Sequence, residues 1–134
     1  MATKTDCYVD TSALIAFLDR SDSSDALFRG LFSEPPPLVT SALVIAEGHG
    51  WFLRRYDRRR AVQFLAFIDA LPGLTIRAFD AAELAKASRV VKKFADQNLT
   101  PADAHGLAAM RDPRITCCWM TDRHLGLDGA RLVV

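Results

Sequence analysis

The chain has 134 residues, of which 50% are hydrophobic and 25% are charged, with a formal net charge of +1. This composition predicts one globular domain over residues 1–134, and no run approaches the ~20 apolar residues of a membrane span. The near-neutral charge gives no global sign of a nucleic-acid partner, and the absence of a signal peptide predicts a cytoplasmic protein.

The first half of the chain alternates short β-prone runs with segments of helical periodicity. "CYV" is a candidate strand, "DTS" a turn and helix cap, and "EPPP" and "PG" are terminators. The predicted elements are a strand at 7–9, a helix at 13–19, a helix at 21–32, a strand at 38–40, and helices at 41–54 and 58–71.

The second half continues the alternation. Asp80 and Glu83 resemble a capping box, and Thr100 followed by Pro101 is typical of a helix start. The predicted elements are a strand at 74–79, a helix at 81–95, a helix beginning at 101, a strand at 115–120 and a final strand at 130–134. Strands that alternate with helices predict an α/β fold with a parallel sheet covered on both faces.

The three cysteines, Cys7, Cys117 and Cys118, lie in short apolar runs. Their number is odd and their spacing does not suit a metal site, so we predict buried thiols and no disulfide.

Four acidic residues occupy positions where strands end or where helices face the core. Asp10 and Asp122 directly follow predicted strands, Asp103 shares a helical stripe with Leu107, and Glu47 shares one with Val44. Each acid alone has an ordinary explanation as a helix cap, a dipole partner or an ion pair. Four carboxylates around one pocket, however, would need a cation, and carboxylate oxygens suit Mg²⁺ or Mn²⁺. The pattern therefore predicts a divalent metal site.

The motifs that carry these acids resemble a known family. In order along the chain, "YVDTSALIAFLD", "TSALVIAE", "LTPADAHGLAAM" and "TDRHLG" are similar to the four acidic motifs of PIN-domain ribonucleases, in particular to VapC-type toxins of toxin–antitoxin pairs. The resemblance implies a three-layer α/β/α domain that cleaves RNA phosphodiesters with Mg²⁺ or Mn²⁺. It also implies a VapB-like antitoxin as a partner.

Carried over to this chain, the resemblance assigns catalytic roles to Asp10, Glu47, Asp103 and Asp122. Of these, Asp10, Asp103 and Asp122 would bind the metal, and Glu47 is either a further ligand or the group that orients water. Ser12 and Thr121 match hydroxyl residues that support the site.

A basic cluster, "RRYDRRR" at 54–60, offers arginines that suit phosphate contacts with RNA. The candidate RNA-binding residues are Arg54, Arg55 and Arg58. Alternatively, the cluster is a solvated helix face, or it belongs to a dimer and antitoxin interface. Apolar residues nearby predict a homodimer patch that contains Trp51, Phe52, Phe64 and Phe67.

Three other functions remain open. The chain is alternatively an RNA-processing nuclease without an antitoxin, or a PIN-fold binding module that has lost catalysis. A phosphatase of the haloacid-dehalogenase kind would use Asp10 as its nucleophile. That class needs a second aspartate two residues later, where Ser12 stands, so it is disfavoured.

Overall fold

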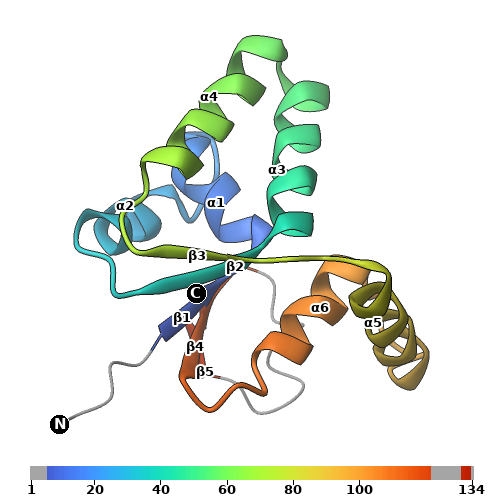
Figure 1. Ribbon diagram of the computed structural model, residues 1–134. Helices are drawn as coiled ribbons and strands as arrows, with labels where there is room; N and C mark the ends of the chain where they lie inside the picture. The colour runs from blue at the N-terminus through green and yellow to red at the C-terminus, as the bar shows by residue number, and fades with distance from the viewer. Residues whose placement is uncertain (1–5, 122–130, 134) are drawn as a thin grey trace, which may run out of the picture.

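The computed structural model describes residues 6–121 and 131–133, and these form three layers (Figure 1). The middle layer is a five-stranded sheet in the order β3-β2-β1-β4-β5, and every neighbouring pair is parallel. The strands are β1 (Asp6–Val9), β2 (Leu38–Ser41), β3 (Leu74–Arg77), β4 (Ile115–Trp119) and β5 (Arg131–Val133). The predicted α/β class and parallel sheet are confirmed.

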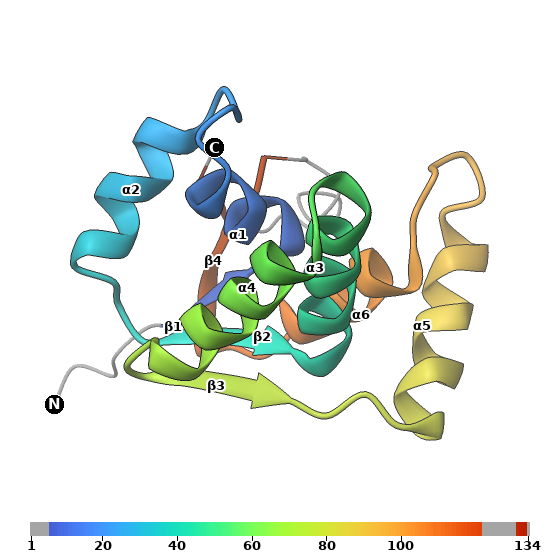
Figure 2. The same cartoon turned by 90° about the horizontal axis from the view of Figure 1, so that it is seen from above.

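Helices cover the sheet on both faces. The helices α1, α2, α3 and α4 lie on one face, and α5 and α6 lie on the other (Figures 1 and 2). Their bounds are α1 (Thr11–Leu18), α2 (Asp25–Ser33), α3 (Ala42–Arg55), α4 (Arg58–Ala70), α5 (Ala81–Lys93) and α6 (Pro101–Ala109). Among the described residues, none of these helices has the length and apolarity needed to cross a membrane.

Alternation along the central strands builds a separate core on each face. In β1, Val9 joins the core under α1–α4 with Phe28 and Phe64, whereas Tyr8 joins the core under α5 and α6 with Leu107. Because both faces of the central strands are buried, most of their side chains are apolar, as is usual for parallel strands in a layered fold.

Polar side chains cap several helices directly after strands or turns. Asp10 accepts a hydrogen bond from the Ser12 amide at the start of α1, and Ser41 accepts one from the Val44 amide at the start of α3. These groups satisfy amides that an α-helix leaves without an internal partner. The first turns of α1 and α3 therefore begin immediately at the carboxyl ends of β1 and β2.

The strand order reverses beside β1. The chain runs from β1 outward through β2 to β3, and then returns to place β4 on the other side of β1. In open parallel sheets, ligands bind at such a reversal, beyond the carboxyl ends of the two strands. In this chain the carboxyl ends of β1 and β4 lead into Asp10 and Thr121.

The prediction of three free thiols was wrong for two of them. Cys7 and Cys117 form a disulfide, while Cys118 is free and buried. The parallel register of β1 and β4 pairs Cys7 with Cys117, and their Cα atoms are 4.8 Å apart. The two cysteines are 110 positions apart in the sequence, and only the order of strands in the sheet brings them together. The spacing of cysteines along the sequence does not reveal that order.

The aromatic residues predicted to form a dimer patch lie mainly inside the fold. Phe52 and Phe64 are each 1% exposed, and their ring centroids are 5.6 Å apart between α3 and α4. Trp51 and Phe67 are partly buried against the same core. The predicted patch was therefore wrong for Phe52 and Phe64, because these two rings pack against each other inside the α3–α4 hairpin.

Candidate active site

Asp10 is a buried carboxylate at the carboxyl end of β1. It is 5% exposed, its backbone N–H donates to the Trp119 carbonyl at 3.0 Å, and its Oδ2 accepts from Ser12 Oγ at 2.8 Å. Burial raises the pKa of Asp10 above its ordinary value, the Ser12 hydrogen bonds act against that rise, and the negative charge of Asp103 adds to it. The carboxylate is thus held rigidly where a positive charge would stabilise it.

Ser12 connects the ends of the two central strands. Its Oγ donates to Asp10 and also accepts from the backbone N–H of Thr121 at 2.9 Å. Ser12 thus makes two hydrogen bonds beside Asp10, and its supporting role in catalysis stays a prediction. Thr121 takes part through its amide, whereas the prediction had assigned its hydroxyl. The next residue, Asp122, lies outside the described residues.

Glu47 reaches this region from α3. The side chain is half-buried, and its Oε2 accepts a hydrogen bond from Thr11 Oγ1 at 3.3 Å. Burial raises the pKa of Glu47; the Thr11 hydrogen bond opposes this, and the charges of Asp103 and Asp10 raise the pKa further. Sequence reasoning missed Thr11, although its place between Asp10 and Ser12 in "DTS" puts it at the first turn of α1.

Asp103 has a structural role as well as an electrostatic one. It forms a reciprocal capping box with Thr100: the Thr100 N–H donates to Asp103 Oδ2 at 3.0 Å, and the Asp103 N–H donates to Thr100 Oγ1 at 3.1 Å. Its charge also acts on both Asp10 and Glu47. The two readings of this acid, as a helix cap and as a member of an acidic site, are therefore compatible.

The acids that the structure describes are electrostatic neighbours without forming a complete metal site. Within residues 6–121 and 131–133, no three carboxylate, imidazole or thiol groups lie close enough to hold an ion together. The donor chemistry nevertheless fits a hard divalent cation, because the acids supply only carboxylate oxygens and their mutual repulsion opposes ionisation.

Most arginines of the cluster at 54–60 are exposed, and Arg60 is partly buried. Arg54, Arg55 and Arg58 are exposed, as phosphate-binding residues need to be. Arg54 folds back along α3, so that its guanidinium lies 3.0 Å from the position that a Cβ on Gly50 would take. Its positive charge lowers the pKa of Glu47, although burial raises that pKa by more. Arg54 is thus the cation of this cluster that is directed toward the acids.

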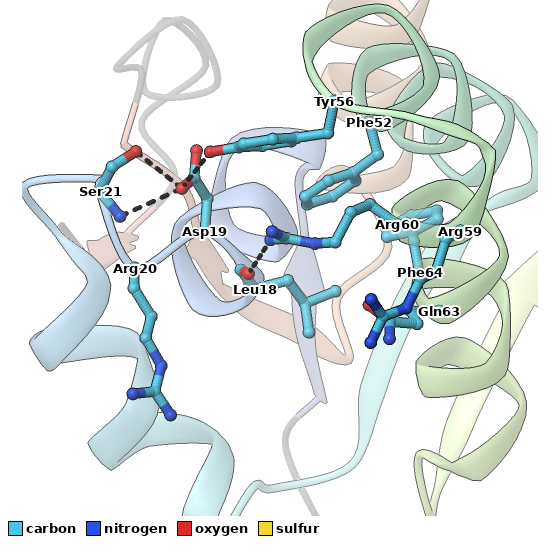
Figure 3. A pocket seen from close by; sticks show the side chains of 10 residues that line it. All are labelled: Leu18, Asp19, Arg20, Ser21, Phe52, Tyr56, Arg59, Arg60, Gln63 and Phe64. Atoms are coloured by element: carbon cyan, nitrogen blue, oxygen red, sulfur yellow. Dashed lines mark hydrogen bonds between the residues drawn. The ribbon is translucent and has the colours of Figure 1, made fainter.

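A separate pocket of about 520 Å³ lies where the end of α1 faces the α3–α4 hairpin (Figure 3). Tyr56 donates from its hydroxyl to Asp19 Oδ1 at 2.8 Å, and Ser21 Oγ donates to the same oxygen at 2.7 Å. Arg60 donates to the Leu18 carbonyl at 3.1 Å and lies over the Tyr56 ring. Tyr56 and Arg60 therefore belong to the internal structure of this pocket.

His105 lies on α6, two residues after Asp103, and is 3% exposed. Its Nε2 is 3.3 Å from Glu83 Oε2, and its ring packs edge-on against Phe79. This placement joins α6 to the start of α5 and makes His105 a structural residue.

Comparison with known proteins gives the family and the fold. The sequence matches the PIN domain family over residues 7–125. The structure of VapC20 from Mycobacterium tuberculosis, described as a toxin that cleaves the sarcin–ricin loop, has 23% identity and a TM-score of 0.82, with 92% of this chain and 95% of that chain covered. No protein of curated function matches this chain.

Two more distant solved structures share the fold. PAE2754 from Pyrobaculum aerophilum has 20% identity and a TM-score of 0.63, with 96% of this chain and 90% of that chain covered. VapBC2 from Rickettsia felis, solved bound to a DNA fragment from its promoter, has 12% identity and a TM-score of 0.64, with 96% and 98% covered. At these identities the similarity supports the three-layer architecture.

Proposed function

Because the chain belongs to the PIN domain family, we propose that it is a metal-dependent endoribonuclease. The observation that carries the proposal is the Ser12 bridge, which joins Asp10 at the end of β1 to the Thr121 amide after β4. The bridge lies at the reversal of strand order, where this class of sheet binds ligands. It brings Thr121, at the exit of β4, within one shared hydroxyl group of Asp10.

The chain's own residues would supply the ligands and the base. We propose that Asp10, Asp103 and Asp122 hold Mg²⁺ or Mn²⁺, with Ser12 keeping the Asp10 carboxylate in one orientation. When bound, the cation would neutralise charge on the scissile phosphate and make a coordinated water more acidic. Thr11 holds Oε2 of Glu47, which leaves Oε1 to accept a proton from the attacking water.

Substrate contacts follow from the same arrangement. Arg54 extends along α3 toward the acids, so it is the arginine best placed to contact a phosphate next to the scissile bond. Arg55 and Arg58 would contact more distant phosphates of the same RNA.

Chelation tests the nuclease proposal directly. Purified protein treated with EDTA and incubated with single-stranded RNA should give no cleavage, and added Mg²⁺ or Mn²⁺ should restore it. Sodium chloride at the same ionic strength is the control and should restore nothing. Undiminished cleavage in EDTA would exclude the proposed role of the metal.

We also propose that the enzyme is the toxin of a toxin–antitoxin pair, with a VapB-like antitoxin as its partner and a homodimer as its working form. The structural similarity to VapC20 and VapBC2 supports this assignment. Induction in a bacterial host should arrest growth for the wild type and not for the Asp10→Asn variant. Equal growth of both strains, at equal protein levels, would favour an RNA-processing enzyme instead.

For the dimer, the exposed apolar side chains of Leu53, Val62 and Leu65 on α3 and α4 offer a more suitable surface than the buried rings. Light scattering at tens of micromolar should give twice the chain mass, and a monomer mass would count against the dimer.

A further inference from the structure

The disulfide between Cys7 and Cys117 joins β1 and β4, the two neighbouring strands whose carboxyl ends lead into the candidate site (Figure 1). Asp10 comes three residues after Cys7. Thr121 comes four residues after Cys117. At about 3.3 Å per residue in a strand, the covalent link therefore lies about 10–13 Å from the two groups that Ser12 joins.

The β1–β4 pairing is irregular beside this disulfide. The register shifts between Asp6 and Cys7, which leaves Thr116 as an extra residue on β4, as in a β-bulge. A slip of one residue in a strand pair turns every side chain of the moving strand to the opposite face of the sheet. The disulfide opposes such a slip, because it joins the strands at the first pair after the irregularity.

Two hydrogen bonds at the candidate site depend on the same register. The Asp10 N–H donates to the Trp119 carbonyl at 3.0 Å, and the Thr121 N–H donates to Ser12 Oγ at 2.9 Å. Each of them joins the segment after β1 to the end of β4. When the two cysteines are reduced, only packing and hydrogen bonds such as these keep the strand ends in place.

The third cysteine does not compete for this bond. Cys118 follows Cys117 in β4, so its side chain points to the opposite face of the sheet, into the core under α5 and α6. Cys7 and Cys117 are each 7% exposed, whereas Cys118 is 0% exposed. Burial raises the pKa of the Cys118 thiol, which keeps it protonated and unreactive. Oxidation and reduction therefore act on one pair.

We propose that Cys7 and Cys117 form a reversible redox switch for the candidate active site. In the oxidised form the disulfide holds the ends of β1 and β4 in the register that the Ser12 hydrogen bonds need, and reduction loosens that register. The effect on RNA cleavage rests on the proposed ribonuclease function, whereas the effect on the sheet does not.

The chemistry is thiol–disulfide exchange with a small thiol such as glutathione. A thiolate of the reductant attacks one sulfur of the disulfide, forms a mixed disulfide and releases the other cysteine as a thiolate, which takes up a proton. A second reductant thiolate then attacks the reductant's sulfur in the mixed disulfide, releases the remaining cysteine and leaves as oxidised glutathione. The protein gains two electrons and two protons, and the reverse sequence restores the disulfide.

Amide hydrogen exchange of the wild-type protein, in oxidised and in reduced glutathione, tests the switch without RNA or metal. After reduction, the Asp10 amide should exchange about 10-fold faster or more. The Ala61 amide, which donates to the Asp57 carbonyl at 3.2 Å at the start of α4, is the matched control and should be accelerated less. Equal acceleration of the two amides would overturn the inference, because it would indicate a general loss of stability only.

Two cysteine variants separate the switch from other effects of glutathione. Cys117→Ala cannot form the disulfide, so its melting temperature should be the same in both buffers. Cys118→Ala is the matched control: it keeps the bonded pair and, like the wild type, should melt about 5–15 °C lower after reduction. A response that persists in Cys117→Ala or vanishes in Cys118→Ala would overturn the assignment of the pair. Three free thiols in the oxidised wild type, counted by alkylation and mass spectrometry, would overturn it as well.

Cleavage at limiting Mn²⁺, after glutathione is removed, connects the switch to the site. The oxidised wild type should reach half-maximal RNA cleavage at a Mn²⁺ concentration about threefold or more below that of the reduced protein. Equal Mn²⁺ requirements would overturn the switch as a device of the active site. If neither form cleaves RNA while the Asp10 amide responds as expected, the nuclease function is wrong and the redox switch of the sheet stands.

Discussion

At the scale of single residues, Ser12 makes the connection on which the candidate site depends. Its hydroxyl donates to Asp10 and accepts from Thr121, so one oxygen atom fixes both a buried carboxylate and the exit of β4. Groups that orient a metal ligand typically contribute 10-fold to 100-fold to metal affinity or activity, about as much as a weak ligand does.

We therefore expect Ser12→Ala to raise the Mn²⁺ concentration needed for half-maximal RNA cleavage about 10-fold or more. The variant keeps the acids but frees the Asp10 carboxylate to rotate. Ser88→Ala is a suitable control, because within the described part of the chain the Ser88 hydroxyl bonds only to the Leu84 carbonyl of its own helix. An unchanged Mn²⁺ requirement in Ser12→Ala would show that the bridge has no part in metal binding.

Asp19 shows how hydrogen bonds can outweigh burial. Burial would raise its pKa, but the hydrogen bonds from Ser21 and Tyr56, together with the charge of Arg55, hold the pKa below its ordinary value. A carboxyl group whose pKa is lower in the folded state stabilises the fold above the unfolded pKa of about 4 and loses that contribution as the pH falls through the folded value.

Tyr56→Phe removes one of these donors. We expect the free energy of unfolding at pH 7 to fall by about 1–2 kcal/mol, since hydrogen bonds to charged groups are stronger than neutral ones. The difference from the wild type should narrow below about pH 4, where Asp19 begins to protonate. Urea unfolding at several pH values measures this; a difference that is independent of pH would mean that the loss is one of packing alone.

At the scale of elements, the α3–α4 hairpin depends on a close approach at Gly48. The Phe64 ring lies directly over this glycine, and a Cβ built there would overlap it. Phe64 is 1% exposed and packs against Phe52, so it has little room to move. Glu47 precedes Gly48, and the same close packing therefore supports one of the candidate catalytic acids.

We expect Gly48→Ala to lower the free energy of unfolding by about 1–3 kcal/mol, because it overpacks the hairpin. Gly30 on α2 is the matched control, since nothing lies within 4 Å of the Cβ that Gly30→Ala would add. In that helix the same substitution should be neutral or stabilising by up to about 1 kcal/mol. Chemical unfolding of both variants distinguishes packing from helix propensity, and equal effects would contradict the packing explanation.

Local sequence patterns predicted the elements well. The strand predicted at 7–9, the helix predicted from 41 and the helix start predicted at Thr100 and Pro101 lie where turn residues and hydrophobic periodicity place them, with Ser41 and Thr100 as the N-caps. The strand predicted at 74–79 ends earlier, at Arg77. These features depend on residues within a few positions of one another, which is why a single sequence reveals them.

Features that depend on contacts between distant segments were harder to predict. The disulfide between Cys7 and Cys117 needs the β1–β4 register, and the burial of Phe52 and Phe64 needs the pairing of α3 with α4. The hydrogen bond from Thr11 to Glu47 likewise joins two helices. Asp10 and Asp103 could be singled out because one follows a strand and the other lies in the first turn of a helix, and Glu47 because it shares a helical stripe with Val44. The contact of Glu47 with Thr11 could not be predicted in this way.

At the scale of the whole molecule, charge is separated over the surface despite a net charge of +1. The described candidate acids act on one another electrostatically at the carboxyl edge of the sheet, while exposed arginines lie on α3 and α4 and four cations line a pocket between α5 and α6. A negative centre that needs a cation, flanked by positive regions, suits a phosphodiester strand that crosses the sheet edge. This distribution supports the nuclease proposal.

The most direct measurement of the central claim is the rate of RNA cleavage by Asp10→Asn in the presence of Mg²⁺, beside Asp80→Asn. Both aspartates are helix N-caps, and asparagine caps a helix about as well as aspartate. A difference in cleavage rate between the two variants therefore reports the loss of the carboxylate of Asp10 and not the loss of a cap. A melting temperature in EDTA at or above that of the wild type will show that Asp10→Asn is folded, since the substitution removes like-charge repulsion. We predict that Asp10→Asn cleaves at least about 100-fold more slowly than the wild type while Asp80→Asn cleaves at the wild-type rate; equal rates for the two variants would contradict the assignment of this site.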